Sequence, residues 1–352
     1  LALMIASIAF IAVYAYHNNR HDALDLTDDL LEALDRRIAA EVKNYLVPAS
    51  DMVSLAARIV KDPAFEITQR SQIEPLAIQI LGNYPQLTIF SIADAKGNFI
   101  MPKKMPDGSI HTKIIDRTAS TKHVKWVQRD TTGRVVSEEE VADDTYDART
   151  RPWYIGAAQA RRLFWTDVYI FFTDQKPGVT AAMPVFDDND QLLGVLGADI
   201  ELSELSNFFS NLTIGRNGLA LIVDQRGRLV AYPEVDRMLK RVGDTIQPAM
   251  LEELGDPVLS RAYNRFKIEG YGSRILTVDN RRYLNSISSL RAIAGRDWSV
   301  MIVVPEDDFI GFVKSTFGKA LLMTSVIVGL ASVMAGLLVI QGLRSVRDAR
   351  EI

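Results

Sequence analysis

The sequence has no cysteine and few histidines, two residue types that metal and redox sites often use. Cysteine is absent from its 352 residues, and only four are histidine. The chain therefore forms no disulfides and offers neither a thiol nucleophile nor a thiolate metal ligand. The aspartate-rich stretch Asp187–Asp190 lacks the glycine and the distal glutamate of a calcium loop, so we interpret it as a solvated hairpin turn. We expect no metal and no cofactor.

Signatures of catalysis and of nucleic-acid binding are also missing. The sequence contains no Gly-x-Ser-x-Gly motif, no glycine-rich phosphate loop and no candidate triad. The formal net charge is −4, and no basic stripe with interleaved aromatic residues is present. We expect no catalytic residue in positions 1–352 and no nucleic-acid partner. A transporter or an envelope enzyme anchored at both ends is the alternative, and hydrolytic activity would support it.

Two stretches, one near each end, carry no charge. Residues 320–340 form an uncharged run of 21 residues. As a helix this run is about 31 Å long at ~1.5 Å per residue, which matches a bilayer core of ~30 Å. We predict a membrane span over 318–342, with a buried core helix as the alternative. Residues 1–16 are uncharged too. They predict a first span over 1–19 that is truncated at its start, with a signal peptide as the alternative.

Three arginines, Arg344, Arg347 and Arg350, follow the second predicted span. By the positive-inside rule they lie in the cytoplasm, so residues 343–352 are expected to begin a cytoplasmic linker. Two spans return the chain to the same side, and the intervening residues are then extracytoplasmic. The predicted location is a bacterial inner membrane with a periplasmic domain, and the lipid bilayer is a predicted partner.

Residues 20–74 are expected to form a stalk helix followed by a second helix. Apolar residues recur every seven positions along one face: Leu24, Leu31, Ile38 and Tyr45, with Leu34 and Val42 between them. We predict that Pro48 interrupts this helix and that a second helix covers Asp51–Lys61. Such a stripe favours a parallel homodimer. The alternative, weighed equally, is that the stripe packs on the chain's own modules.

An internal repeat predicts two α+β modules in tandem. The stretches Leu87–Pro102 and Leu219–Pro233 each hold an apolar strand, an Asp-x-x-Gly turn and a second strand that ends in proline. Each copy is followed by a further hairpin, at Val179–Leu202 and Arg281–Glu306. Each module is thus expected to contain an antiparallel sheet of four or five strands. We place the modules at 75–205 and 206–313, joined by a helix over Glu204–Ile214.

The stretch "YDARTRPWY", residues 146–154, resembles the ligand-site signature of double Cache (dCache) sensors. The layout of the chain also resembles this family: a membrane span, a long stalk helix, two PAS-like modules and a second span. The resemblance covers most of the chain, and it implies that the membrane-distal module, 75–205, binds a small polar ligand. Six residues match the family's ligand-binding positions: Tyr146, Arg151, Trp153, Tyr154, Tyr169 and Asp199.

In amino-acid-binding members of the family, the motif arginine and neighbouring aromatic residues hold the ligand carboxylate. Arg151 matches that arginine, and Asp199 matches the acidic residue that holds the ammonium group. These members usually carry an aspartate at the position of Phe171, so a carboxylate or another small polar metabolite is expected as much as an α-amino acid. The expected partner is therefore a small polar ligand: an amino acid, an amine or a carboxylate. The alternative is structural, with Arg151 paired to Asp147 or Asp199 and with Trp153 in the core.

A narrower resemblance concerns the output of the receptor. Phe164–Val185 and Trp298–Val313 are similar to sensor regions of alphaproteobacterial class III adenylate cyclases. The resemblance implies a HAMP-like linker near Gly342 and a cyclase domain after it. A chemoreceptor, a histidine kinase and a diguanylate cyclase are the alternatives. The proximal module, 206–313, lacks an equivalent of the Arg-x-Trp-Tyr motif, so we expect it to act as a mechanical relay.

Overall fold

The computed structural model describes most of the chain between residues 2 and 309. The described residues are 2–62, 65, 67, 69–118, 122–243, 245–291, 296–309 and scattered positions from 322 to 340, and the side chains of the first helix are described at 10, 14, 29 and from 31 onward. The predicted linker 343–352 and most of the predicted span 318–342 lie outside these residues. Among those described, no helix is long and apolar enough to cross a membrane.

A single helix, α1, runs over Ala2–Val60. The predicted break at Pro48 and the separate helix over Asp51–Lys61 are therefore wrong. A proline inside a helix costs about 3 kcal/mol, but this part of α1 buries Leu46 and Ala49 completely or nearly so. Ser50 Oγ also donates to the carbonyl oxygen of Val47 at 2.8 Å, beside the proline. Tertiary packing therefore keeps the helix continuous.

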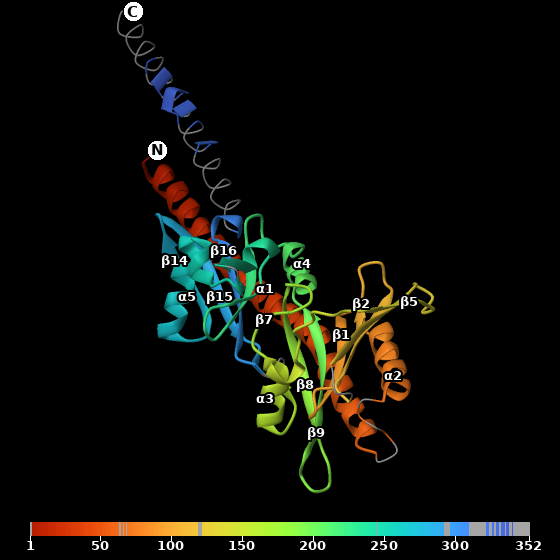
Figure 1. Cartoon of the computed structure of the whole chain (residues 1–352). Helices are drawn as coiled ribbons and strands as arrows, with labels where there is room; N and C mark the ends of the chain where they lie inside the picture. Colours follow the sequence, from red (N-terminus) through yellow and green to blue (C-terminus); the bar gives the residue numbers. More distant parts are fainter. Residues whose placement is uncertain are drawn as a thin grey trace, which may run out of the picture.

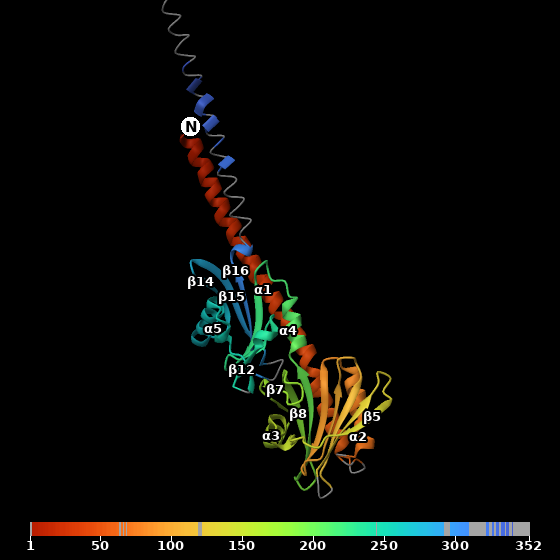
Figure 2. The ribbon, with the colours of Figure 1, turned by 45° about the horizontal axis from the view of Figure 1, so that its top comes forward.

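The apolar stripe of α1 packs on the chain's own sheets. Leu31, Leu34, Ile38 and Val42 are buried in one hydrophobic core with residues of both sheets. Tyr45 Oη donates to the carbonyl oxygen of Glu201 at 2.8 Å. The stripe therefore gives no support to the parallel homodimer, which stays a prediction. Figures 1 and 2 show α1 running past both sheets, with its N-terminal end projecting beyond the second.

The first sheet has nine strands, all paired antiparallel, in the order β5-β4-β3-β2-β1-β9-β8-β6, with β7 also paired to β8. Its strands are β1 (Leu87–Asp94), β2 (Phe99–Lys104), β3 (Ile110–Asp116), β4 (His123–Arg129), β5 (Val135–Glu140), β6 (Phe164–Trp165), β7 (Tyr169–Ile170), β8 (Pro177–Phe186) and β9 (Leu192–Glu201). Helices α2 (Arg70–Asn83) and α3 (Pro152–Ala160) pack on it. Nine strands exceed the predicted four or five, because the two predicted hairpins account only for β1, β2, β8 and β9 and not for β3–β7.

The second sheet has five strands, in the order β11-β10-β16-β15-β14, as predicted for this module. Its strands are β10 (Leu219–Asp224), β11 (Leu229–Ala231), β14 (Gly272–Val278), β15 (Arg281–Ser289) and β16 (Trp298–Pro305). Helix α5 (Pro257–Glu269) lies against it, and α4 (Ser203–Ser210) follows the first sheet where a connecting helix was predicted. A small hairpin joins β12 (Leu239–Val242) to β13 (Thr245–Pro248), and 3-10 helices cover Ala148–Thr150, Val235–Met238 and Leu251–Leu254.

The repeated Asp-x-x-Gly turns adopt the same conformation in both sheets. Gly97 and Gly227 have φ of 91° and 81°, which side chains disfavour. Asp94 Oδ1 accepts from the amide of Asn98 at 2.8 Å. Asp224 Oδ1 accepts from the amide of Arg228 at 3.0 Å. The hairpins predicted from the repeat are therefore confirmed. The turn at Asp187–Asp190 joins β8 and β9, as expected.

Candidate ligand-binding site

Local sequence fixes the backbone of the Arg-Pro-Trp-Tyr motif. Asp147 caps a short 3-10 helix, because its side chain accepts from the amide of Arg149 at 3.0 Å. Pro152 then opens α3, where its missing N–H has no cost. A residue before proline is pushed to extended backbone, and Arg151 has φ −88° and ψ 149°. The motif thus places Arg151 at the start of α3.

The guanidinium of Arg151 lies among three aromatic rings. Its Cζ is 6.0 Å from the ring centroid of Tyr146, 5.9 Å from that of Tyr169 and 5.7 Å from that of Phe172. Cations at such distances interact favourably with ring faces. Within the described part of the chain, the side chain of Arg151 has no ion pair with a carboxylate. The positive charge of Arg151 is therefore stabilised by cation–π interactions with these three rings.

The carboxylates named in the structural alternative are engaged elsewhere. Asp147 Oδ2 is 2.7 Å from Arg149 Nη2 and 3.4 Å from Arg117 Nη2. Asp199 Oδ1 accepts from Thr180 Oγ1 at 2.6 Å. Arg151 is thus paired with neither of the two carboxylates that the alternative assigned to it.

Asp199 is buried, and among the described residues its carboxylate forms no ion pair within hydrogen-bonding distance. Its side chain lies on β9 with 9 % exposure. Tyr169 Oη is 2.7 Å from the same Thr180 hydroxyl, so the three side chains form one chain of hydrogen bonds. Burial raises the pKa of Asp199 to about 7; the Thr180 hydrogen bond opposes this, the charge of Asp174 adds to it, and Arg151 lowers it. The residue therefore titrates near neutral pH.

Trp153 and Tyr154 belong to the core of the first module, as the structural alternative held for Trp153. They are 3 % and 6 % exposed, and their ring centroids are 5.7 Å apart. Tyr154 Oη donates to the carbonyl oxygen of Asp94 at 3.3 Å. Tyr146 is buried in the same core, and burial raises its pKa, while hydrogen bonding to Trp153 and the charge of Arg151 oppose the rise. Trp153 and Tyr154 are thus core residues that pack beside Tyr146.

Two lysines beside the site, Lys113 and Lys103, were not predicted from the sequence. Lys113 on β3 lies with its Nζ 4.9 Å from the ring centroid of Tyr146, and it pairs with Asp144 at 2.5 Å. Lys103 on β2 pairs with Asp174, from the turn between β7 and β8. Neither lysine is close to the motif in sequence. The pairing of β1, β2 and β3 brings them to the site, and no local pattern could have revealed it.

Phe171, where amino-acid-binding dCache members usually have aspartate, is buried at the edge of the site. Its ring centroid is 5.2 Å from that of Tyr169. A Cβ added to Gly178 would lie 2.0 Å from the Phe171 ring, so the glycine makes room for it. A carboxylate is supplied three residues later by Asp174, whose charge acts on Asp199.

Comparison with known proteins identifies the family. Residues 23–311 match the Cache domain family, in its double form dCache_1. The chain belongs to the Cache domain family. Adenylate cyclase 1 of Rhizobium meliloti is 21 % identical over 350 residues, which cover 95 % of this chain and 52 % of that protein. The methyl-accepting chemotaxis protein PctB of Pseudomonas aeruginosa is 27 % identical over 162 residues, 46 % of this chain and 23 % of that protein. This Cache chain thus spans between about a quarter and half of these relatives.

Solved Cache structures share the fold. The ligand-binding domain of PctB in complex with L-Arg has a TM-score of 0.53 and 20 % identity, covering 79 % of this chain and 95 % of that chain. The ligand-binding domain of the Pseudomonas fluorescens chemoreceptor CtaA in complex with L-isoleucine has a TM-score of 0.55 and 17 % identity, covering 84 % and 98 %. At these identities the likeness concerns the fold alone.

Proposed function

We propose that this chain is the extracytoplasmic sensor region of a two-span receptor in a bacterial inner membrane, and that its distal module, 75–205, binds a small polar ligand. The observation that carries the proposal is the arrangement of Arg151: a guanidinium among Tyr146, Tyr169 and Phe172, unpaired with Asp147 and Asp199. A planar guanidinium matches a carboxylate in two parallel hydrogen bonds. Asp199 can accept an ammonium group at the other end.

An L-amino acid satisfies both charges, so it is the ligand class that we favour. The PctB and CtaA domains are solved with L-Arg and L-isoleucine, which supports this choice by analogy. A carboxylate or an amine alone would satisfy only one of the two charged residues. The proximal module, 206–313, has no equivalent motif and is proposed to relay the signal.

The experiment is a thermal-shift screen of the whole chain in detergent against the L-amino acids, matched amines, matched carboxylates and purines. We expect at least one amino acid to raise the melting temperature in a saturable way. Absence of any saturable shift across the panel would contradict the proposed function. A shift with purines alone would contradict the ligand class.

For the output, we propose an adenylate cyclase domain beyond this chain. The similarity to Adenylate cyclase 1 extends over 95 % of this chain, whereas the similarity to PctB covers 46 %. Cyclic AMP production by the complete receptor in a cyclase-deficient bacterial host is the test. Ligand-dependent methylation without cyclic AMP would favour a chemoreceptor instead.

A further inference from the structure

The segment that carries Tyr169 also bridges the two sheets. Between β6 and β7, Asp167 leaves the first sheet and meets two arginines of the second module. Its Oδ2 is 2.8 Å from Arg228 Nη2, and its Oδ1 pairs with Arg296 Nη2. Arg296 Nη1 also donates to the carbonyl oxygen of Trp165 at 2.8 Å. One short segment of the distal module is therefore held at two points by the proximal module.

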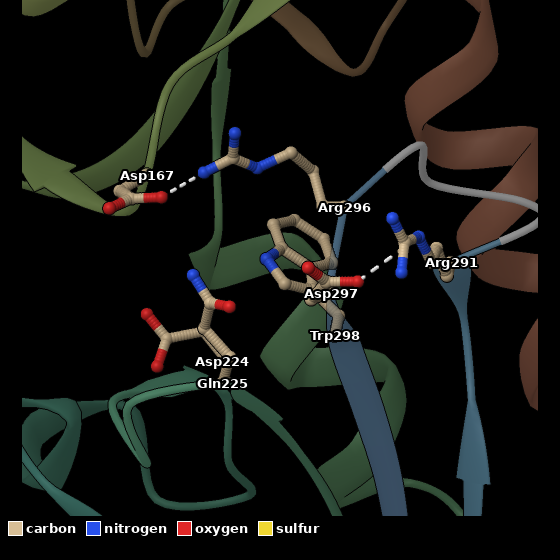
Figure 3. A pocket seen from close by; sticks show the side chains of 7 residues that line it. All are labelled: Asp167, Asp224, Gln225, Arg291, Arg296, Asp297 and Trp298. Carbon is tan, nitrogen blue, oxygen red and sulfur yellow. Dashed lines mark hydrogen bonds and ion pairs between the residues drawn. The ribbon is translucent and has the colours of Figure 1, made fainter.

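A polar cavity of about 210 Å³ lies at this junction. Figure 3 shows Asp167 and Arg296 pointing toward each other, with Asp224 and Gln225 lying below them. Near this junction, strand β7 of the distal module packs against strand β13 of the proximal module. The junction thus combines ion pairs with backbone packing.

The two arginines are fixed on elements of the proximal sheet. Arg228 Nε donates to Asp224 Oδ2 at 2.6 Å, within the turn between β10 and β11. Arg296 lies two residues before β16, and burial lowers its pKa. A partly buried guanidinium depends on its carboxylate, because removing one partner of such a pair leaves the other charge uncompensated. Asp167 is that carboxylate for Arg296 and is shared with Arg228.

Hydrogen bonds connect Asp167 to the candidate ligand site. The neighbouring Thr166 donates its amide to the carbonyl oxygen of Thr180 at 3.0 Å and accepts from the Thr180 amide at 2.9 Å. The hydroxyl of Thr180 in turn contacts Asp199 and Tyr169. Thr166 is 1 % exposed, so this connection lies inside the protein. A continuous path therefore runs from Asp199 through Thr180 and Thr166 to Asp167.

We propose that Asp167 is a positioning residue that fixes the ligand-site segment Phe164–Ile170 on the proximal module, so that a shift at Thr180 and Asp199 moves the proximal sheet. The positioning role concerns the ligand-free protein, while the transmission role rests on the proposed function. Without this anchor, α1, α4 and the packing of β7 on β13 still join the modules, but the ion pairs at the junction are lost and relative motion between the modules increases.

The absence of cysteine makes a direct test possible. Two cysteines introduced at exposed positions, Asn189→Cys in the distal module and Ile268→Cys in the proximal module, accept spin labels at these sites alone. Ile268 is 85 % exposed. Pulsed electron spin resonance on the whole chain then gives the distribution of distances between the modules. Asp167→Asn is the test variant, and Asp190→Asn, which removes an exposed ion pair with Arg161 within the distal module, is the matched control.

We expect a narrow distribution in the parent chain and in Asp190→Asn, and a width about twice as large in Asp167→Asn. Asp167→Glu, which keeps a carboxylate for both Arg228 and Arg296, should give a width closer to that of the parent than Asp167→Asn does. Equal widths in the parent and Asp167→Asn would overturn the positioning role, and so would equal broadening in both asparagine variants.

Transmission is tested on the same label pair with L-glutamine and L-arginine as probes. A probe that raises the melting temperature should shift the mean distance in the parent and not in Asp167→Asn. An identical shift in both would overturn transmission through Asp167. If neither probe binds but another amino acid of the screening panel does, that amino acid serves as the probe in the same measurement. If no ligand of the panel binds the parent chain, the proposed function fails and transmission through Asp167 is overturned with it, whereas the ligand-free widths still decide the positioning role.

Discussion

The hydroxyl of Thr180 donates to the carboxylate of Asp199 at 2.6 Å, and this neutral contact stands where an ion pair would be expected for a buried carboxylate. The pKa of Asp199 is raised to about 7 chiefly because the surrounding protein replaces water. Asp199 is therefore a buried carboxyl group whose pKa lies far above its ordinary value of 3.8. A cationic ligand group would complete its ionisation.

The first prediction concerns the free energy of unfolding as a function of pH. Folding raises the pKa of Asp199 from 3.8 to about 7, so the folded chain binds this proton more tightly than the unfolded chain. Its stabilising effect is full below pH 4 and is lost as the pH rises to 7. Asp199→Asn cannot ionise. Its stability relative to the parent should therefore rise across this interval, by on the order of 4 kcal/mol.

Denaturant unfolding at several values between pH 4 and 8 measures this difference. Asp188→Asn, the same substitution at a side chain that is 95 % exposed, is the control with which the change is compared. A flat difference for Asp199→Asn would contradict the titration that we assign to Asp199.

The second prediction is that the pH dependence of binding identifies the ligand class. An ammonium group needs the ionised form of Asp199, so its affinity should rise about tenfold per pH unit below 7 and level off above. A ligand with a carboxylate and no amine should bind less well above pH 7. Calorimetric titration of the chain with an L-amino acid and with its deaminated counterpart, at several pH values, distinguishes an ammonium-bearing ligand from a simple carboxylate. In Asp199→Asn both dependences should disappear; their persistence would exclude Asp199 as their source.

The third prediction tests the influence of Asp174. Its negative charge helps to raise the pKa of Asp199, so Asp174→Asn should lower that pKa and move the titration to lower pH. Carboxyl-carbon nuclear magnetic resonance of Asp199 measures the midpoint directly. Asp190→Asn, an exposed residue paired with Arg161, is the control and should leave the midpoint unchanged. An unchanged or higher midpoint in Asp174→Asn would show that the two carboxylates do not interact.

The fourth prediction concerns the stalk. Ile38 is completely buried on α1 in the core shared with both sheets, whereas Leu55, also on α1, is half exposed. Ile38→Ala should destabilise the chain by about 2–5 kcal/mol, and Leu55→Ala by less than ~1 kcal/mol. Equilibrium unfolding of both variants is the measurement. Similar small losses would mean that the stripe does not pack on the chain's own modules.

The predictions made from the sequence were most accurate for elements that a short local motif specifies. The Asp94 and Asp224 turns, the β8–β9 and β15–β16 hairpins and the connecting helix α4 were all found from short motifs. Strand β5 was missed because all its residues are exposed, which leaves no alternation of apolar and polar side chains. The helix break predicted at Pro48 was wrong, because burial of the neighbouring residues of α1 outweighs the low helix propensity of proline.

The candidate site was predictable only in part. The motif residues Tyr146 and Arg151 were found through the family resemblance, and the structure brings them together with Tyr169. Lys113 and Asp174 were missed, because they reach the site through strand pairing and a turn. The motif left two positions open for Trp153, at the ligand or in the core, and could not decide between them because burial depends on the surrounding sheet.

The central claim, that Arg151 holds the carboxylate of a ligand, is tested most directly by calorimetric titration of the parent chain and two arginine variants with the amino acid selected in the thermal screen. Arg151→Ala should reduce affinity at least ~100-fold, because it removes a charge-assisted pair of hydrogen bonds. Arg149→Ala is the matched control: this neighbour pairs with Asp147, and its loss should change affinity less than ~3-fold. Equal affinity in Arg151→Ala and the parent, with both chains folded, would contradict the account.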